Sequence, residues 1–213
     1  MQTSRVIEPD SRLAVLVPDL GDRIAEYGQV TDALVQAGAV VVGHELPALI
    51  TDFEQVVDEL AQVIDQQPAG LPLVLVGHAV GGMVVVRYTQ RYPDRVAALV
   101  LSAPVLGPWQ TLDLLSEQDT GSFDRETLQA IETCLSTIDF DHPLGDALPG
   151  LWLHSADDAD VPLADTRAGM DRIRGLRFEE RIYPGVGHDV LDTKQAPVDI
   201  AEFVQSSGSG TAS

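Results

Sequence analysis

Apolar runs of strand length alternate along the chain with longer stretches in which apolar residues recur every three or four positions. The runs of strand length are Leu13–Val17, Ala39–Val42, Leu71–Val76, Val96–Leu101, Leu151–His154 and Arg177–Tyr183. The first five are continuous and predict strands that are covered on both faces. The last run alternates apolar and polar residues, which predicts a strand near an edge of the sheet.

The stretches between these runs predict helices, and several of them carry end signals. They are Tyr27–Gln36, Thr51–Gln66, Val80–Tyr92, Pro162–Ile173 and Pro197–Gln205. Gly38 follows the first stretch and Pro93 follows the third, as expected at helix ends, and the last two carry a proline near their start. Regular strand–helix alternation predicts an α/β fold with a doubly wound, mostly parallel sheet of about six strands.

The alternation is interrupted once, between the strands that end near Leu101 and begin near Leu151. We expect an inserted helical cap at about residues 107–147, which would cover the carboxyl edge of the sheet, where open α/β sheets bind ligands. The apolar cap residues Trp109, Leu115, Phe123 and Leu128 either form the core of this insert or line an acyl pocket. Residues 1–205 would then form a single domain, followed by a flexible tail at 206–213.

Composition narrows the possible partners. The 213 residues carry 33 acidic and 13 basic side chains, a net charge of −20, which disfavours binding to nucleic acid or to anionic lipid. The cap segment is itself acidic, with nine acids against Arg125 alone, which disfavours an anionic substrate.

The lone cysteine, Cys134, excludes an internal disulfide and is interpreted as a buried hydrophobe. No run of 18 apolar residues and no signal core is present, so we expect a cytoplasmic protein without stable membrane insertion.

The most informative motif is Gly77-His-Ala-Val-Gly-Gly82, which lies between a predicted strand and a predicted helix. A Gly-x-Ser-x-Gly sequence in that context is a nucleophile elbow, where a strained turn presents a serine to the reacting centre. Here the central residue is Ala79, whose methyl group cannot attack a carbonyl. His78, beside it, is interpreted as structural.

Two loops further along complete the order nucleophile, acid, base. An acidic loop that contains Asp157, Asp158 and Asp160 follows one predicted strand, and His188 follows the next. The other histidines fit no ligand spacing, and we expect neither a metal nor a cofactor.

Together these motifs make the chain resemble the α/β-hydrolase family, in particular its monoacylglycerol lipase and carboxylesterase branch. The similarity extends over nearly all of residues 12–205 and rests on Leu71–Gly82, Tyr92–Val96, Leu101–Gly107, Leu151–Asp158 with Val161-Pro162, and Tyr183–His188.

This resemblance implies roles for particular residues. The catalytic acid falls on Asp158, the base on His188 and the nucleophile position on Ala79, while the backbone N–H groups of Leu20 and Val80 would form the oxyanion hole. The sequence departs from the family at Ala79 and also in its first loop, where Pro18-Asp19 replaces the usual His-Gly. Asp19 would place a carboxylate near a site that should stabilise negative charge.

Three functions remain open. The chain is a carboxylic-ester hydrolase scaffold whose serine has been replaced, by engineering or by descent, and which is inactive as an esterase in this form. Alternatively it is a serine-free lyase, isomerase or cyclase in which Asp158 and His188 act as a general base, or a non-catalytic member that binds a ligand. In each case we expect a small neutral or hydrophobic, acyl-type partner.

Overall fold

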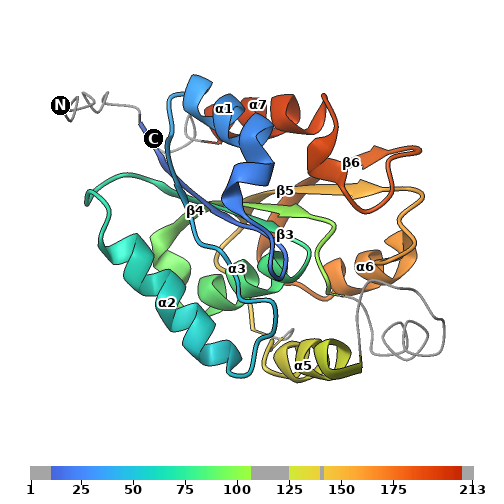
Figure 1. Ribbon diagram of the computed structural model, residues 1–213. Helices are drawn as coiled ribbons and strands as arrows, with labels where there is room; N and C mark the ends of the chain where they lie inside the picture. The colour runs from blue at the N-terminus through green and yellow to red at the C-terminus, as the bar shows by residue number, and fades with distance from the viewer. Residues whose placement is uncertain (1–10, 107–124, 140–141, 208–213) are drawn as a thin grey trace.

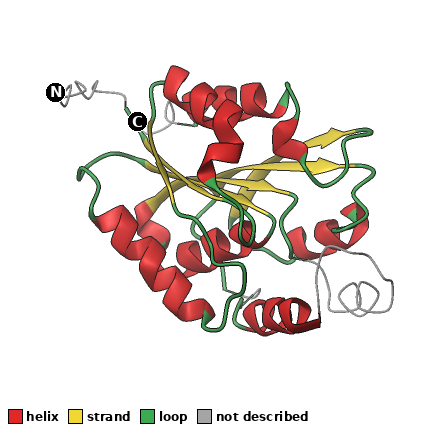
Figure 2. Ribbon diagram, in the orientation of Figure 1, coloured by secondary structure: helices red, strands yellow, loops and turns green. Residues whose placement is uncertain are grey.

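The computed structural model describes residues 11–106, 125–139 and 142–207, and within them one six-stranded parallel sheet runs through the molecule (Figures 1 and 2). Its strand order is β2-β1-β3-β4-β5-β6. The strands are β1 (Leu13–Val17), β2 (Val40–Gly43), β3 (Leu73–His78), β4 (Val96–Ser102), β5 (Leu148–Ser155) and β6 (Leu176–Tyr183). All five neighbouring pairs are parallel, which confirms the predicted doubly wound α/β class.

Helices cover both faces of this sheet. They are α1 (Gly28–Gln36), α2 (Phe53–Asp65), α3 (Val80–Arg91), α5 (Arg125–Ser136), α6 (Leu163–Met170) and α7 (Ala196–Ser206), with 3₁₀ turns at Ile24–Tyr27, Pro93–Arg95 and Val190–Asp192. Figure 1 shows α1 and α7 together on one face and α2, α3, α5 and α6 on the other. The carboxyl ends of the strands therefore meet at one edge between two helical layers.

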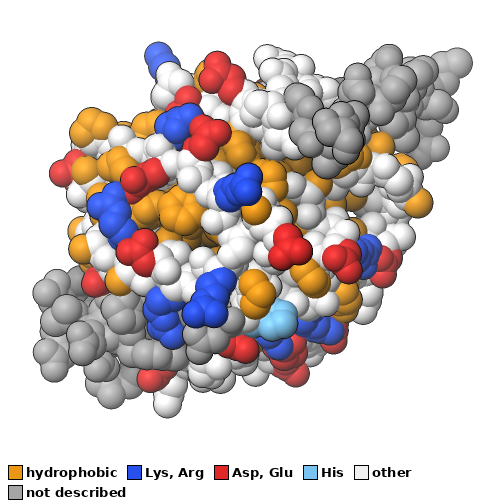
Figure 3. All heavy atoms as spheres, turned by 180° about the vertical axis from the view of Figure 1, so that it is seen from behind, with side chains coloured by type: hydrophobic (Ala, Val, Ile, Leu, Met, Phe, Trp, Pro, Cys, Tyr) orange, Lys and Arg blue, Asp and Glu red, His pale blue; other side chains and the backbone are white. Residues whose placement is uncertain are grey.

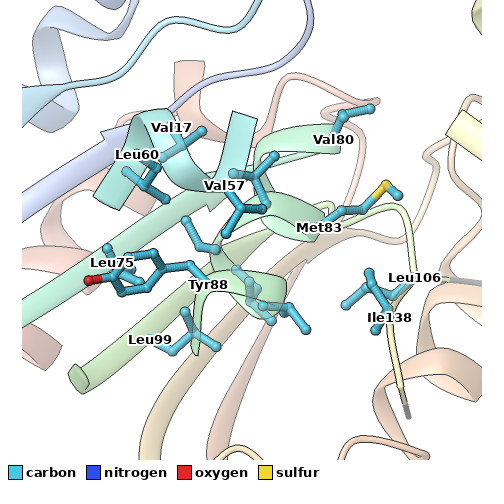
Figure 4. Packing of buried hydrophobic residues seen from close by; sticks show 14 of the residues in the cluster. Val17, Val57, Leu60, Leu75, Val80, Met83, Tyr88, Leu99, Leu106 and Ile138 are labelled. Carbon is cyan, nitrogen blue, oxygen red and sulfur yellow. The ribbon is translucent and has the colours of Figure 1, made fainter. Parts of the chain in front are cut away.

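The core consists of two apolar clusters, one on each face of the sheet. In β3, Leu73 and Leu75 pack into the larger cluster with α2 and α3, whereas Val74 and Val76 pack into the smaller cluster with α1 and α7. Figure 4 shows side chains of the larger cluster. A central strand with apolar side chains on both faces accounts for the continuous apolar runs in the sequence.

The two edge strands differ in how well their exposure was predicted. The alternating run at Leu176–Tyr183 is an edge strand, as expected. The prediction that Ala39–Val42 forms a strand covered on both faces was wrong: β2 is the other edge, and all four of its residues are partly exposed. An apolar run alone does not distinguish a central strand from an edge strand whose side chains are only half covered.

The predicted cap lies partly outside the described residues. Trp109, Leu115 and Phe123 fall in the undescribed segment 107–124, and the side chain of Leu128 is not described either. The described part of this region contains α5, which packs against the larger core cluster through Ile131, Leu135 and their neighbours. Cys134 on the same helix is buried, and burial raises the pKa of its thiol to about 11.

No described helix is both long enough and apolar enough to cross a membrane. The face shown in Figure 3 instead carries basic side chains beside acidic ones.

Candidate functional site

Ala79 occupies a strained turn at the point where β3 ends and α3 begins. Its backbone angles are φ 48° and ψ −114°, a conformation that residues with a side chain rarely adopt. Such a conformation costs on the order of 1–3 kcal/mol and persists only where the surrounding structure holds it in place. The Ala79 N–H donates to Ser102 O at 2.9 Å, and Ala79 O accepts from the N–H of Val105 at 3.2 Å. The elbow is thus fixed to the end of β4, even though the residue at its tip has no reactive group.

Glycines allow this turn to approach its neighbours closely. A Cβ atom on Gly81 would lie 2.2 Å from Val17 O and 2.4 Å from Pro18 O, at the end of β1. A Cβ atom on Gly77 would lie 2.6 Å from Gly81 O. The elbow therefore lies directly against the loop that follows β1, and only residues without a side chain fit at these two positions.

His188 and Asp158 are joined by a hydrogen bond. The distance between His188 Nδ1 and Asp158 Oδ2 is 2.9 Å. The other carboxylate oxygen, Asp158 Oδ1, accepts from the N–H groups of Asp160 at 3.0 Å and Val161 at 2.8 Å. Asp157, the alternative acid, instead accepts from the Gly185 N–H. Among the acids of this loop, the structure thus brings Asp158 to the histidine.

Burial and pairing together set the protonation of this pair. Burial lowers the pKa of His188, but the hydrogen bond and charge of Asp158, with smaller contributions from Asp19 and Asp160, outweigh that effect and raise the pKa above its usual 6.5. Burial raises the pKa of Asp158, but the hydrogen bond and charge of His188 and the Val161 N–H outweigh it, so this pKa lies below its usual 3.8. Asp158 is therefore an anion that favours a protonated His188.

The second ring nitrogen of His188 is left unpaired. Its Nε2 atom is buried and has no hydrogen-bond partner among the described residues. The ring packs on that of His78, with a centroid distance of 5.1 Å, and His78 immediately precedes Ala79 in the chain. The imidazole of His188 is thereby placed next to the elbow with one nitrogen free to exchange a proton.

His78 is buried and neutral. Its Nδ1 atom lies 3.1 Å from Ser102 O, and burial, assisted by the charge of His188, lowers its pKa to about 3. This agrees with a structural role, but its ring contact with His188 had no signal in the sequence. A neutral ring at this place supports the neighbouring imidazole without adding a second charge.

Asp19 accepts a hydrogen bond from a group that was expected to bind an oxyanion. The Val80 N–H, one of the two expected oxyanion donors, donates to Asp19 Oδ1 at 3.1 Å. Burial raises the pKa of Asp19, while the N–H groups of Leu20 and Val80 and the charge of His188 offset part of that increase. The expected donors Leu20 and Val80 are therefore close to one another, but their N–H groups stabilise the protein's own carboxylate.

A cavity of about 340 Å³ opens beside His78. It is lined by Asp22, Glu26, Tyr27, His78, Asp189, Leu191 and Asp192. Tyr27 OH donates to Asp22 Oδ2 at 2.6 Å, so these two lining groups are already hydrogen-bonded to each other. The cavity is acidic, unlike the apolar pocket expected between the cap and the elbow; that pocket involves residues outside those described.

Three side chains here have the donor types of a metal site. One ligand atom each from Asp158, Asp160 and His188 lies within 4.8 Å of the others. Two of these residues, however, already bond to each other, and Asp158 also accepts two backbone N–H groups. The hydrogen bonding of Asp158 and His188 is also the kind by which an acid orients a base.

The sequence is similar to a known protein family and to two lipases. The sequence matches the family described as "Serine aminopeptidase, S33" over residues 8–119. It is 26% identical to a monoacylglycerol lipase of Mycolicibacterium smegmatis over 254 aligned positions, covering 91% of this chain and 88% of the relative. It is also 35% identical to lipase LipV of Mycobacterium tuberculosis over 109 positions, covering 51% of this chain and 36% of that lipase.

Solved structures share the fold. The monoacylglycerol lipase of Paleococcus ferrophilus superposes with a TM-score of 0.70 at 18% identity, covering 92% of this chain and 94% of the other. The family match extends over more than half of the chain and includes the elbow, while the structural likeness extends over nearly all of it. The chain belongs to the serine aminopeptidase S33 family of α/β-hydrolases.

Proposed function

We propose that the chain binds a lipophilic carboxylic ester at the elbow, and that Ala79 leaves it unable to hydrolyse that ester through an acyl-enzyme. The observation that carries this proposal is the Asp158–His188 pair, with an unpaired Nε2, beside an elbow that is empty of a nucleophile. The lipase relatives support an ester as the ligand class. The cap at residues 107–147, with Trp109, Leu115, Phe123 and Leu128, would contact the acyl part.

In a form with serine at position 79, each group has a defined task. The hydroxyl would attack the ester carbonyl, His188 Nε2 would accept its proton, and Asp158 would orient the ring and stabilise the imidazolium. The Leu20 and Val80 N–H groups would bind the oxyanion, provided that Asp19 moved away. With Ala79, the ester would bind but no covalent bond could form.

Ala79→Ser tests this proposal, with 4-nitrophenyl butyrate as substrate. Removal of the nucleophile from a serine protease lowers turnover by about 10⁶, so restoring even about 10³ would correspond to about 4 kcal/mol of barrier. We expect hydrolysis by Ala79→Ser, more by Ala79→Ser/Asp19→Gly, and none by Ala79→Ser/His188→Gln. The rate should rise with pH through a pKa above 6.5, because only neutral His188 can accept the proton.

Failure of both serine variants to hydrolyse an ester panel from acetate to decanoate would contradict the proposal. Binding is checked separately, by calorimetric titration of the unaltered chain with a non-hydrolysable ketone analogue of the ester.

A second candidate is a serine-free enzyme in which His188 and Asp158 act as a general base. The hydrogen bond from the Val80 N–H to Asp19 favours this second candidate. A carboxylate at the expected oxyanion hole disfavours ester hydrolysis, and it also supplies a second group that can transfer a proton.

A further inference from the structure

Asp19 and His188 come from two loops that both contact the elbow, Asp19 through the Val80 N–H and His188 through the ring of His78. Asp19 comes from the end of β1, where the close packing of Gly81 on Val17 and Pro18 fixes the loop against the elbow. His188 comes from the loop after β6 and packs on His78. The two side chains interact electrostatically, and each has a group that can carry a proton.

We propose that Asp19 is a catalytic acid–base residue, which works with His188 to move protons between two atoms of a neutral carbonyl substrate. The proposal rests on the serine-free candidate above and names its second group and its substrate class. The site would enolise a ketone or a similar compound that has an acidic C–H next to its carbonyl.

A hydrogen bond places the carboxyl group of Asp19 at the elbow. Its Oδ1 atom accepts the N–H of Val80, at the place where an ester's carbonyl oxygen would lie. A protonated carboxyl group held there can donate to a carbonyl oxygen, as the backbone N–H groups do in an esterase. An acid in place of the family's glycine thus adds, beside the backbone donors, a group that can also transfer its proton.

Burial and charge favour one shared proton between the two residues. Burial raises the pKa of Asp19, and the negative charges of Asp158, Asp19 and Asp160 raise that of His188. Asp22 and Tyr27 also interact with Asp19, and His78 and His154 interact with His188. Whichever residue holds the proton, its partner is left as the base, so the pair can accept one proton while it donates another.

The reaction balances without a co-reactant. The base removes a proton from the carbon next to the carbonyl, and the C–H electron pair becomes the C=C bond of an enol. The acid gives its proton to the carbonyl oxygen, whose C=O π pair forms the new O–H bond. Reversal, with the proton returned to the same or a conjugated carbon, gives exchange or isomerisation. A neutral substrate fits because Asp19, Asp158 and Asp160 would repel an anion.

The first test measures the pairing without a substrate. The pKa of His188 is followed by NMR of its ring nitrogens in the unaltered chain, in Asp19→Asn and in Asp32→Asn. We expect Asp19→Asn to lower it by about one pH unit, because a neighbouring negative charge is removed. Asp32→Asn, which removes an exposed acid on α1, serves as the matched control and should leave the value nearly unchanged. An unchanged pKa of His188 in Asp19→Asn would overturn the pairing.

The second test measures the chemistry, with phenylacetone in D₂O as probe and loss of its C–H signals by NMR as readout. Exchange by the unaltered chain should exceed that of buffer and fall about 100-fold or more in Asp19→Asn and in His188→Gln, but not in Asp32→Asn. Asp19→Gly, which restores the residue typical of the family, gives a second variant if Asp19→Asn does not fold.

The outcomes separate this inference from the functions it rests on. Loss of exchange in His188→Gln, but not in either Asp19 variant, would overturn the role of Asp19 and leave His188 as the general base. No exchange above buffer by the unaltered chain would overturn both the role of Asp19 and the serine-free function in which His188 is the general base. Ester hydrolysis by Ala79→Ser is measured independently and bears only on the esterase proposal.

Discussion

The Asp19 carboxylate receives the hydrogen bond that the resemblance to esterases assigns to an oxyanion. A carboxylate near this site was expected from the sequence, because Pro18-Asp19 replaces the usual His-Gly. Its acceptance of the Val80 N–H depends on the conformation of the loop, which neither hydrophobic pattern nor composition defines. The contact of His78 with His188 could not be predicted from the sequence either, since it joins the end of β3 to a loop far away in the chain.

The loops that carry Asp158 and His188 were predictable, because the carboxyl ends of parallel strands meet at one edge of the sheet. The choice of Asp158 among three neighbouring acids came from the family resemblance. The structure supplies its physical basis, since Asp157 accepts a hydrogen bond from the Gly185 N–H and Asp158 bonds to the ring of His188.

Asp19→Asn should stabilise the protein at high pH. Burial raises the pKa of Asp19 in the folded state, so folding disfavours its ionised form. This unfavourable contribution is absent below about pH 3.8, the usual value, and is complete above the folded-state pKa. We expect Asp19→Asn to raise the free energy of unfolding by about 1–3 kcal/mol at pH 8 but not at pH 4, as measured by urea denaturation. Equal effects at both pH values would contradict this assignment.

Asp158→Asn should have its largest effect between about pH 4 and 6.5. The raised pKa of His188 stabilises the fold fully below 6.5, and this contribution is lost as the pH rises through the folded-state value. The lowered pKa of Asp158 stabilises the fold above 3.8, and this is lost on further acidification. We expect a loss of about 1.5–3 kcal/mol at pH 6 and a smaller one at pH 9, from urea denaturation at both. A larger loss at pH 9 would show that the pair is not coupled in this way.

At the scale of elements, the hydrophobic pattern predicted all six strands of the sheet, with boundaries differing by up to three residues. It could not predict the exposure of β2, which depends on the strand order. The helix α2 starts at the N-cap Asp52, whose side chain accepts the Gln55 N–H at 3.0 Å. Capping is a local interaction and can be predicted from sequence, whereas strand order is determined by packing across the whole chain.

Gly81→Ala should destabilise the junction between β1, β3 and α3. The added methyl group would lie 2.2 Å from Val17 O, and a backbone atom cannot move away as a side chain can. We expect a loss of about 3 kcal/mol or more, measured by thermal or urea unfolding. Gly28→Ala is the matched control: it lies on α1 with no atom within 4 Å of the new methyl group and should stabilise by about 0.5–1 kcal/mol. Similar effects at both positions would contradict the close packing described here.

At the scale of the whole molecule, the net charge of −20 opposes the compact state. Arginines on α3 and just after it reduce the repulsion between acidic side chains locally. Arg87 and Arg91 pair with Glu54 of α2, and Arg95 pairs with Asp65. Such exposed pairs contribute little each, and the described ion pairs involve only a minority of the 33 acidic residues. Repulsion among the remaining acids should therefore dominate the response to salt.

Raising NaCl from 20 to 500 mM at pH 7.5 should stabilise the protein by about 1 kcal/mol, a rise of about 2–4 °C in Tm. Screening weakens the repulsion more than it weakens the few ion pairs. Calorimetry in NaCl and in KCl checks this, since a screening effect is the same for both. A fall in Tm with salt would show that the ion pairs outweigh the repulsion.

The central claim is that position 79 is a nucleophile position next to a working base, and covalent labelling tests it most directly. Intact-mass spectrometry after treatment with paraoxon, an organophosphate that phosphorylates activated serines, compares Ala79→Ser, Ala79→Ser/His188→Gln and the unaltered chain. Our account predicts one diethylphosphoryl adduct, at position 79, in Ala79→Ser alone. The absence of an adduct from both Ala79→Ser and Ala79→Ser/Asp19→Gly would contradict it. An equal adduct in Ala79→Ser/His188→Gln would contradict it as well.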